Sequence, residues 1–285
     1  WVDISSTCIK NNNKNMSKVK KVLDEAKDLQ NPELDLVERG IFSFDDMPGL
    51  MDMLNITRLS LSHNKISVVP ASIANLSNLE ILNFSNNHIE ELPLSLSSMP
   101  KLRILNVSIN RLNTLPRGFG AFPVLEVLDL TYNNLNEEAL PGNFFMMETL
   151  RALYLGDNDF VHFPKEVGQL KNLQILGLRE NDLVDIPKEI GELSRLRELH
   201  LQANRLTVLP PEIGNLDMLS NKAVLKLEGN AWKTPIAEQL VLGLSHLMEY
   251  LRSETYRILY NRHVAANEPP PPLDVDKSKK ASRAR

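Results

Sequence analysis

The chain is poor in cysteine, in long apolar runs and in aromatic residues, and the first two absences restrict its class. It has one cysteine, Cys8, among 285 residues, which excludes an intramolecular disulfide and a zinc site built from cysteines. No apolar run approaches the roughly 18 residues that a membrane-spanning helix requires. The first 14 residues show no apolar stretch typical of a secretory signal. We therefore expect neither a membrane span nor secretion.

The charge is unevenly distributed along the chain. Residues 1–21 hold five lysines and one aspartate, and residues 277–285 hold five basic residues and no acidic ones. The remaining residues hold 22 basic and 35 acidic side chains, so the body of the protein is acidic between two short basic ends. Because nucleic-acid binding depends on Lys and Arg that neutralise phosphates, an acidic body argues against a nucleic-acid partner.

Motifs of catalysis are absent as well. The sequence contains neither a phosphate loop of the G-x-x-x-x-G-K-[ST] type nor a G-x-S-x-G nucleophile turn. Gly118-Phe119-Gly120 lacks the third glycine of a dinucleotide site and leads into Pro123. The six histidines are scattered, with no H-x-x-x-H pair. We expect no enzyme activity, no cofactor and no metal.

What the chain does contain is an internal repeat. The pattern L-x-x-L-x-L-x-x-N-x-L recurs eight times, at a period of mostly 23 residues. Its asparagines are Asn64, Asn87, Asn110, Asn133, Asn158, Asn181, Asn204 and Asn230. Prolines follow at 70, 93, 116, 141, 164, 187 and 210. This is a leucine-rich repeat, in which each unit buries its leucines only by stacking on its neighbours.

The repeat predicts the fold class and the domain organisation. We expect an α/β solenoid, a leucine-rich-repeat horseshoe with a parallel concave β-sheet and helical caps at both ends. The expected order is a disordered extension (1–16), an N-terminal helical cap (17–33), the repeats (34–234), a C-terminal helical cap (235–267) and a disordered proline-rich, basic tail (268–285). Extracellular repeats of this type commonly close their caps with disulfides, so caps without cysteine indicate a cytoplasmic protein.

The candidate functional residues are those that alternate with the leucines and therefore face outward from the concave sheet. Tyrosine and arginine are frequent binding hot spots, and aspartates beside them favour a partner with basic groups. The partner-binding candidates are Asp129, Tyr132, Tyr154, Asp157, Asp159, Arg179 and His200. The alternative for any one of them is a merely solubilising polar side chain.

Several stretches go beyond the generic repeat and resemble a known family. They include RLNTLPRGFG at residues 111–120, LPGNFF at 140–145 with its two-residue insertion, TLRALYL at 149–155, NRLTVLPPE at 204–212 and RSETY at 252–256. These stretches closely resemble the Ras suppressor proteins of animals, over about residues 16–265.

The resemblance implies a function that spacing and composition do not supply. It implies a non-enzymatic cytoplasmic adaptor at cell–matrix (focal) adhesions, which binds the last LIM domain of PINCH and, through PINCH, integrin-linked kinase and parvin. It also implies a link to Ras and stress-kinase signalling, and we expect a monomer. The alternative is a scaffold or regulator that binds Ras and a phosphatase in the Ras–Raf pathway. That scaffold has the same 23-residue repeat but more than twice as many units.

Overall fold

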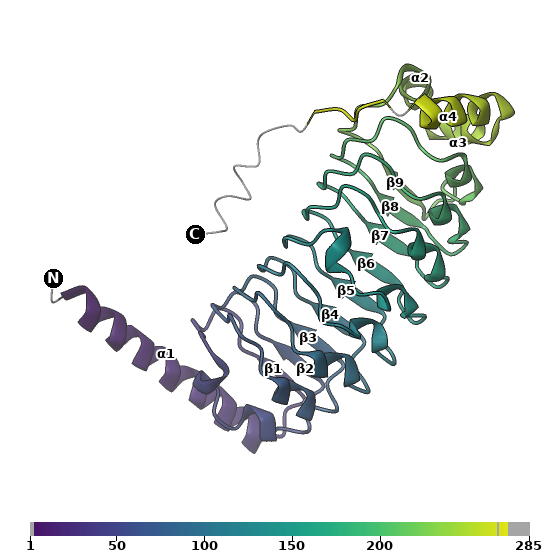
Figure 1. Ribbon diagram of the computed structural model, residues 1–285. Coiled ribbons are helices and arrows are strands. Elements are labelled where there is room, and N and C mark those ends of the chain that lie inside the picture. The colour runs from purple at the N-terminus through teal and green to yellow at the C-terminus, as the bar shows by residue number, and fades with distance from the viewer. Residues whose placement is uncertain (1–2, 267, 273–285) are drawn as a thin grey trace. The chain divides into compact units, whose positions relative to one another are not determined.

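The structure is a computed structural model that describes residues 3–266 and 268–272, with side chains described from Met16 onward. Two compact units make up this part of the chain. The first comprises residues 3–134 and 139–150, and the second comprises residues 135–138, 151–266 and 268–272. Figure 1 labels the helices and strands of both units.

Each repeat contributes one short parallel strand, and the strand order follows the chain. The first unit contains β1 (Glu33–Asp35), β2 (Arg58–Ser60), β3 (Ile81–Asn83), β4 (Ile104–Asn106) and β5 (Val127–Asp129). The second contains β6 (Ala152–Tyr154), β7 (Ile175–Gly177), β8 (Glu198–His200) and β9 (Val224–Lys226). The register is constant from strand to strand, since Leu59 pairs with Leu82 and Leu153 pairs with Leu176. This parallel sheet with helical ends confirms the predicted leucine-rich-repeat class.

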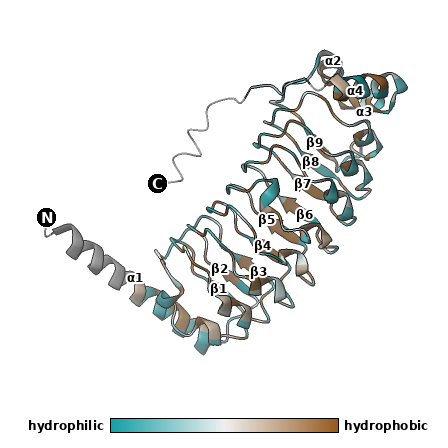
Figure 2. Cartoon of the chain, in the orientation of Figure 1, coloured by the Kyte–Doolittle hydropathy of each residue, from teal (hydrophilic) through white to brown (hydrophobic). Residues whose placement is uncertain are grey.

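The repeated leucines form the core of both units. The middle residue of β2 to β8 is a leucine that is fully buried, as at Leu82 in the first unit and Leu176 in the second. Figure 2 shows the strands as largely hydrophobic. Fully burying such a side chain stabilises the fold by roughly 1.5–3 kcal/mol, and stacking repeats is what makes the burial possible.

On the side of each repeat away from its strand, most segments form a short 3₁₀ helix (Figure 1). Five of these helices follow a proline, whose fixed φ suits a helix start and whose missing N–H needs no strand partner there. They are η3 (Ala71–Asn75), η4 (Leu94–Ser98), η8 (Lys165–Gln169), η9 (Lys188–Glu192) and η10 (Pro211–Asn215). The other 3₁₀ helices are η1 (Phe44–Asp46), η2 (Leu50–Asp52), η5 (Phe119–Ala121), η6 (Glu137–Ala139) and η7 (Phe144–Met146).

The repeated asparagines hold the chain where it turns inward from each strand. Nδ2 of Asn110 donates to the carbonyl oxygens of Phe84 and Val107, and its Oδ1 accepts the N–H of Ile89. Asn181 repeats the arrangement in the second unit. Each amide therefore satisfies buried backbone groups of two successive repeats, which would otherwise cost about 1–3 kcal/mol each.

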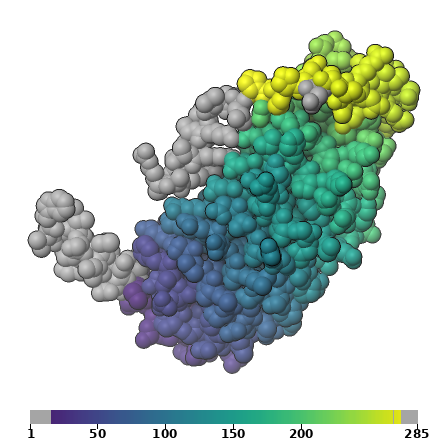
Figure 3. Space-filling model, in the orientation of Figure 1, coloured from purple at the N-terminus to yellow at the C-terminus, as the bar shows by residue number. Residues whose placement is uncertain are grey.

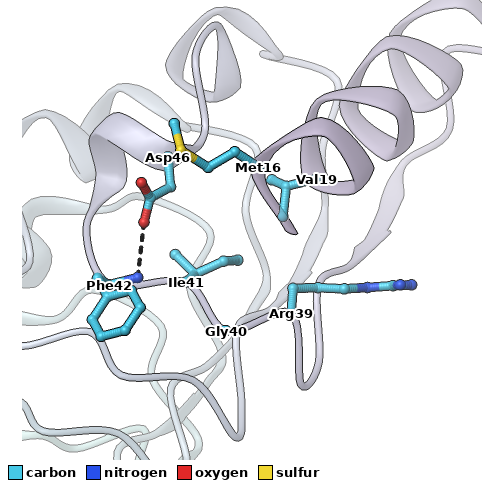
Figure 4. A pocket seen from close by; sticks show the side chains of 7 residues that line it. All are labelled: Met16, Val19, Arg39, Gly40, Ile41, Phe42 and Asp46. Atoms are coloured by element: carbon cyan, nitrogen blue, oxygen red, sulfur yellow. Dashed lines mark hydrogen bonds between the residues drawn. The ribbon is translucent and has the colours of Figure 1, made fainter. Parts of the chain in front are cut away.

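The N-terminal cap is the helix α1 (Asp3–Asp28), which begins earlier than the sequence analysis predicted. Residues 1–16 were expected to be disordered, but residues 3–16 belong to this helix. Residues 1 and 2 lie outside the described part of the chain. Residues 3–16 contain neither proline nor glycine, so nothing in them interrupts a helix. Val19, Leu23 and Ala26 are buried. Figure 4 shows Met16 and Val19 of α1 above Ile41 and Phe42 of the first repeat.

The C-terminal cap consists of three helices, whereas the apolar spacing over residues 235–262 predicts one or two. They are α2 (Thr234–Leu242), α3 (Leu244–Arg252) and α4 (Glu254–Ala266), and Gly243 with φ of 119° separates the first two. Leu247 and Leu251 are fully buried, as their spacing predicts. The same spacing predicts that Ile258 is buried beside them, but Ile258 is 46% exposed. Tyr256 is buried instead, because its hydroxyl finds hydrogen-bond partners in the last repeats.

The start of the proline-rich tail also differs from expectation. Residues 268–285 were expected to be disordered, yet residues 268–272 lie against the second unit. Lys233 Nζ lies 2.6 Å from Glu268 Oε2, and Arg205 Nε donates to the carbonyl oxygen of Pro271 at 2.9 Å. The ion pair at Glu268 and the hydrogen bond at Pro271 stabilise this docked position of the segment. The rest of that prediction, residues 273–285, lies outside the described residues.

Candidate partner-binding face

The side chains that alternate with the buried leucines point outward and form what we call the strand face. In the first unit, the constant register arranges them in two rows that run across β2 to β5. Apolar residues follow Arg58 in one row, and polar residues make up the other. The first row is Arg58, Ile81, Ile104 and Val127, and the second is Ser60, Asn83, Asn106 and Asp129.

The polar row has a structural role besides its exposure. Oδ1 of Asn83, Asn106 and Asp129 each accepts the backbone N–H of the residue two positions later, at 2.9 Å in every case. These bonds stabilise the turn that follows each strand. Asp129 is half-buried and keeps its place on the strand face, where the sequence predicted it.

Tyr132 occupies the next outward position, immediately before the repeated Asn133. Its φ is 65°, in the left-handed region, and the equivalent residues His63, Asn86 and Ile109 share this conformation. These residues therefore lie in the turn that follows each strand, and not on the strands themselves. Tyr132 is half-buried, so part of this amphipathic residue remains accessible after the end of β5.

In the second unit, Tyr154, Gly177 and His200 are register partners on β6, β7 and β8. A Cβ placed on Gly177 would lie 3.2 Å from Cδ1 of Tyr154, so the tyrosine ring leans across the glycine. His200 lies on the other side, with Nε2 3.4 Å from Oε2 of Glu198. Tyr154 and His200 therefore form an aromatic and polar surface, and this surface is lowest at Gly177, which has no side chain.

Asp157 and Arg179 form an ion pair, so each partly neutralises the charge of the other. Arg179 Nη2 lies 3.0 Å from Asp157 Oδ2, and Asp157 is only 6% exposed. The stem of Arg179 crosses Gly156, where an added Cβ would be 2.9 Å from Arg179 Cγ. This ion pair bridges two successive repeats, and the geometry gives Asp157 a mainly structural role.

The seven predicted site residues are thus divided between the two units. Asp129 and Tyr132 belong to the first unit, and the other five belong to the second. Asp159 stands apart from the strand row, because it follows the repeated Asn158 and its N–H donates to Leu135 in the turn that leaves the strand.

Two features of the strand face involve residues that were not among the predicted site residues. The row of Ile81, Ile104 and Val127 is apolar and only half-buried, and Gly177 makes room for Tyr154. Both have a signal in the sequence, since all four residues occupy positions flanking the central strand leucine. The repeat register would have placed the three apolar residues next to one another.

The chemistry available on this face is that of binding. Among the described residues, no group of three or more His, Cys, Asp or Glu side chains is placed to hold a metal ion. Within the same part of the chain, no helix is long and apolar enough to cross a bilayer. Exposed apolar rows flanked by hydrogen-bonding side chains are typical of protein interfaces.

Solved structures with similar architecture are themselves leucine-rich-repeat proteins. The ectodomain of the Arabidopsis receptor kinase HAESA, solved in complex with an N-terminally extended IDA peptide hormone, matches with a TM-score of 0.61 and 30% identity over 72% of this chain and 36% of its own. The ectodomain of GASSHO1/SCHENGEN3 from Arabidopsis thaliana matches with a TM-score of 0.57 and 32% identity over 65% of this chain and 23% of its own. This chain therefore spans only a small part of either receptor.

Sequence comparison covers most of the chain. Family models described as leucine-rich repeat and leucine-rich repeat region match residues 54–112 and 118–254. Ras suppressor protein 1 of Homo sapiens is 67% identical over 269 residues, which is 94% of this chain and 97% of the human protein. The Mus musculus protein is 65% identical over the same shares. Repeats of this kind in such a protein support a protein-interaction scaffold, and the chain belongs to the Ras suppressor protein family of leucine-rich-repeat proteins.

Proposed function

We propose that this protein is a non-enzymatic cytoplasmic adaptor that binds the C-terminal LIM domain of PINCH through its strand face. In this role it joins integrin-linked kinase and parvin at cell–matrix adhesions and connects them to Ras and stress-kinase signalling. The observation that carries the proposal is the 67% identity to a Ras suppressor protein over nearly its whole length. At that similarity, relatives ordinarily share a fold and a binding surface.

The strand face supports the proposal on physical grounds. In the first unit, Ile81, Ile104 and Val127 offer a half-exposed apolar row beside the polar row that ends at Asp129. In the second unit, Tyr154 and His200 flank Gly177. A LIM domain is a small, compact zinc-built module, and a partner of that size needs a surface with an apolar centre and polar surroundings.

The test is calorimetric titration of the C-terminal LIM domain of PINCH into the full chain. Two variants probe the units separately, Ile104→Ser in the first and Tyr154→Ala in the second. Because truncating a central interface residue typically costs about 2 kcal/mol or more, we expect binding to weaken by at least roughly 30-fold in whichever variant removes a central contact.

Lys165→Ala is the matched control, since Lys165 is exposed on η8, away from the strands. It should bind like the wild type. No binding by the wild type would refute the PINCH partner. Binding that is unchanged in both strand-face variants would keep the partner and refute this face.

The family name itself supports a second partner. The curated relatives are called Ras suppressor proteins, and a direct contact with a GTP-loaded Ras protein would fit that name. Running the same titration with GTP-loaded Ras in place of the LIM domain separates the two. Binding to Ras alone would favour the scaffold of the Ras–Raf pathway.

A further inference from the structure

The second unit carries a groove that the strand face does not include. It crosses three successive repeats and ends against α4. Its wall contains Val161, Val184 and Val208, with Tyr260 and Val264 contributed by the cap. The equivalents of Val161 and Val184 in three earlier repeats are Ser67, Glu90 and Asn113. The apolar wall is therefore a local feature and not a property of the repeat.

The chain's own proline segment lies in this groove. Pro269, Pro270 and Pro271 border a cavity of about 480 Å³ together with the wall residues. In Figure 3, the yellow end of the chain continues from the helical cap along the surface of the green repeats. A second cavity of about 330 Å³, towards α2, shares Lys233, Tyr260 and His263 with the first. The three prolines line the first of these cavities without filling it, and only Glu268 of the segment borders the second.

Polar side chains hold the segment at both ends. Lys233 Nζ lies 2.6 Å from Oε2 of Glu268. Arg205 donates to the carbonyl oxygen of Pro271 from Nε at 2.9 Å and also from Nη2. From Glu268 to Pro271 a polyproline II helix extends about 9 Å, so the two anchors set a short, defined spacing between an acidic side chain and a proline carbonyl.

The chemistry of the groove matches polyproline II helices better than other peptides. Such helices have no internal hydrogen bonds, so their carbonyl oxygens remain available to a donor such as Arg205. Their proline rings pack on aromatic and aliphatic walls, and little conformational entropy is lost because they are already extended. His263 also lines the groove, and its buried Nδ1 has no hydrogen-bond partner among the described residues.

We propose that this groove is a binding site for proline-rich segments of the form acidic residue followed by prolines, and that residues 268–272 occupy it intramolecularly. The site is independent of the strand face and of any LIM-domain partner. A tethered segment acts at an effective concentration on the order of millimolar. The resident prolines therefore compete with any proline-rich partner, and a partner binds when it displaces them.

The test uses the full chain and a blocked peptide, acetyl-Asn-Glu-Pro-Pro-Pro-Pro-amide, which copies residues 267–272. In the opened variant, Glu268 and the four prolines 269–272 are all replaced by serine. We expect the peptide to bind the opened variant at one site and the wild type at least about tenfold more weakly, because the wild-type groove is occupied. Calorimetry gives both affinities, and circular dichroism checks the fold.

Two controls test the chemistry of the site. In the opened variant, Arg205→Ala should weaken peptide binding by about tenfold or more, as expected for loss of a charged hydrogen bond. Arg111→Ala should change nothing, since Arg111 follows Asn110 as Arg205 follows Asn204 but lies in the first unit. A peptide with serines in place of prolines should not bind.

Three results would overturn the proposal. The first is that the proline peptide does not bind the opened variant at about 1 mM, a concentration at which even a binding free energy near −4 kcal/mol is detected. The second is that the serine peptide binds equally well. The third is that Arg205→Ala and Arg111→Ala have equal effects.

Discussion

At the scale of single residues, the turn before each repeated asparagine demands an unusual backbone. The residue before the asparagine has a positive φ in every repeat with a described strand face, from His63 at 57° to Ala203 at 56°. Asparagine and glycine adopt this conformation readily, and Asn86 and Gly229 do so here. A β-branched residue adopts it only with strain.

Ile109 is the β-branched residue in that position, with φ of 55°, and it is 41% exposed. We expect Ile109→Asn to raise the free energy of unfolding by about 1 kcal/mol, because left-handed strain costs 1–2 kcal/mol and little burial is lost. Urea unfolding measures the change. Asn86→Ile, the reverse exchange one repeat earlier, should lower stability by at least as much, because it also removes the hydrogen bond between Asn86 Nδ2 and His63 Nδ1. A stabilising effect of both substitutions would contradict the explanation.

At the scale of elements, the 3₁₀ helices of neighbouring repeats approach so closely that some positions exclude a side chain. A Cβ on Gly120 of η5 would lie 1.8 Å from the carbonyl oxygen of Asn143, just before η7. Phe119 and Phe144 stack beside this contact, with ring centroids 6.3 Å apart. The Gly118-Phe119-Gly120 sequence therefore serves helix packing.

Gly120→Ala should accordingly lower the free energy of unfolding by about 3 kcal/mol or more, since overpacking against backbone forces the two helices apart. Gly142→Ala is the matched control, because a Cβ there would meet nothing within 4 Å. Thermal and urea unfolding of both variants would measure the difference. Similar losses in the two variants would mean that backbone freedom, and not helix packing, explains Gly120.

The phenol of Tyr256 makes two hydrogen bonds that join the helix α4 to the last repeats. The hydroxyl of Tyr256 donates to the carbonyl oxygen of Leu209 at 2.5 Å and accepts the N–H of Leu209 at 3.1 Å. Tyr256 is 2% exposed, and burial raises the pKa of its hydroxyl well above the ordinary value of 10. The neutral phenol is therefore the form that the folded state holds.

Tyr256→Phe should lower the free energy of unfolding by about 3 kcal/mol, because it leaves two buried backbone groups unpaired. The raised pKa also predicts a pH dependence. Its stabilising contribution is complete below about pH 10, the unfolded pKa, and declines as pH rises from there towards the folded pKa. Urea unfolding at several pH values should show a steeper alkaline loss in the wild type than in Tyr256→Phe. Equal slopes would contradict this assignment.

At the scale of the whole molecule, the acidic body is the feature that acts over a distance. Outside the two basic ends, the chain has 35 acidic and 22 basic residues. Many exposed charges pair across repeats, as Lys171 and Glu192 do at 3.0 Å, yet the excess remains negative. Such a field accelerates encounters with a basic partner and is screened by salt.

If the partner of the strand face presents basic groups, association should slow as ionic strength rises. We expect the association rate constant for the LIM domain of PINCH to fall roughly tenfold between about 20 and 200 mM salt. The dissociation rate constant should change much less. Stopped-flow measurements distinguish the two rates, and an association rate that is independent of salt would show that the acidic excess plays no part in this encounter.

The sequence by itself determined the repeat, its period and the residues that build it. The leucine spacing and the repeated asparagines are sufficient to predict the fold, because every repeat must bury the same face against its neighbours and therefore has the same residue types at the same positions. The alternation along each strand also predicted that Tyr154 and His200 face outward, as they do on β6 and β8.

Only the tertiary structure decided the contacts made between segments distant in sequence. It paired Asp157 with Arg179, set Tyr154 over Gly177, buried Tyr256 where Ile258 was expected, and laid Glu268 to Pro271 against Lys233 and Arg205. No local pattern encodes these pairings. Each pairing forms because the stacked repeats and the cap bring two distant side chains within a few ångströms of each other. These distances are fixed only once the whole unit has folded.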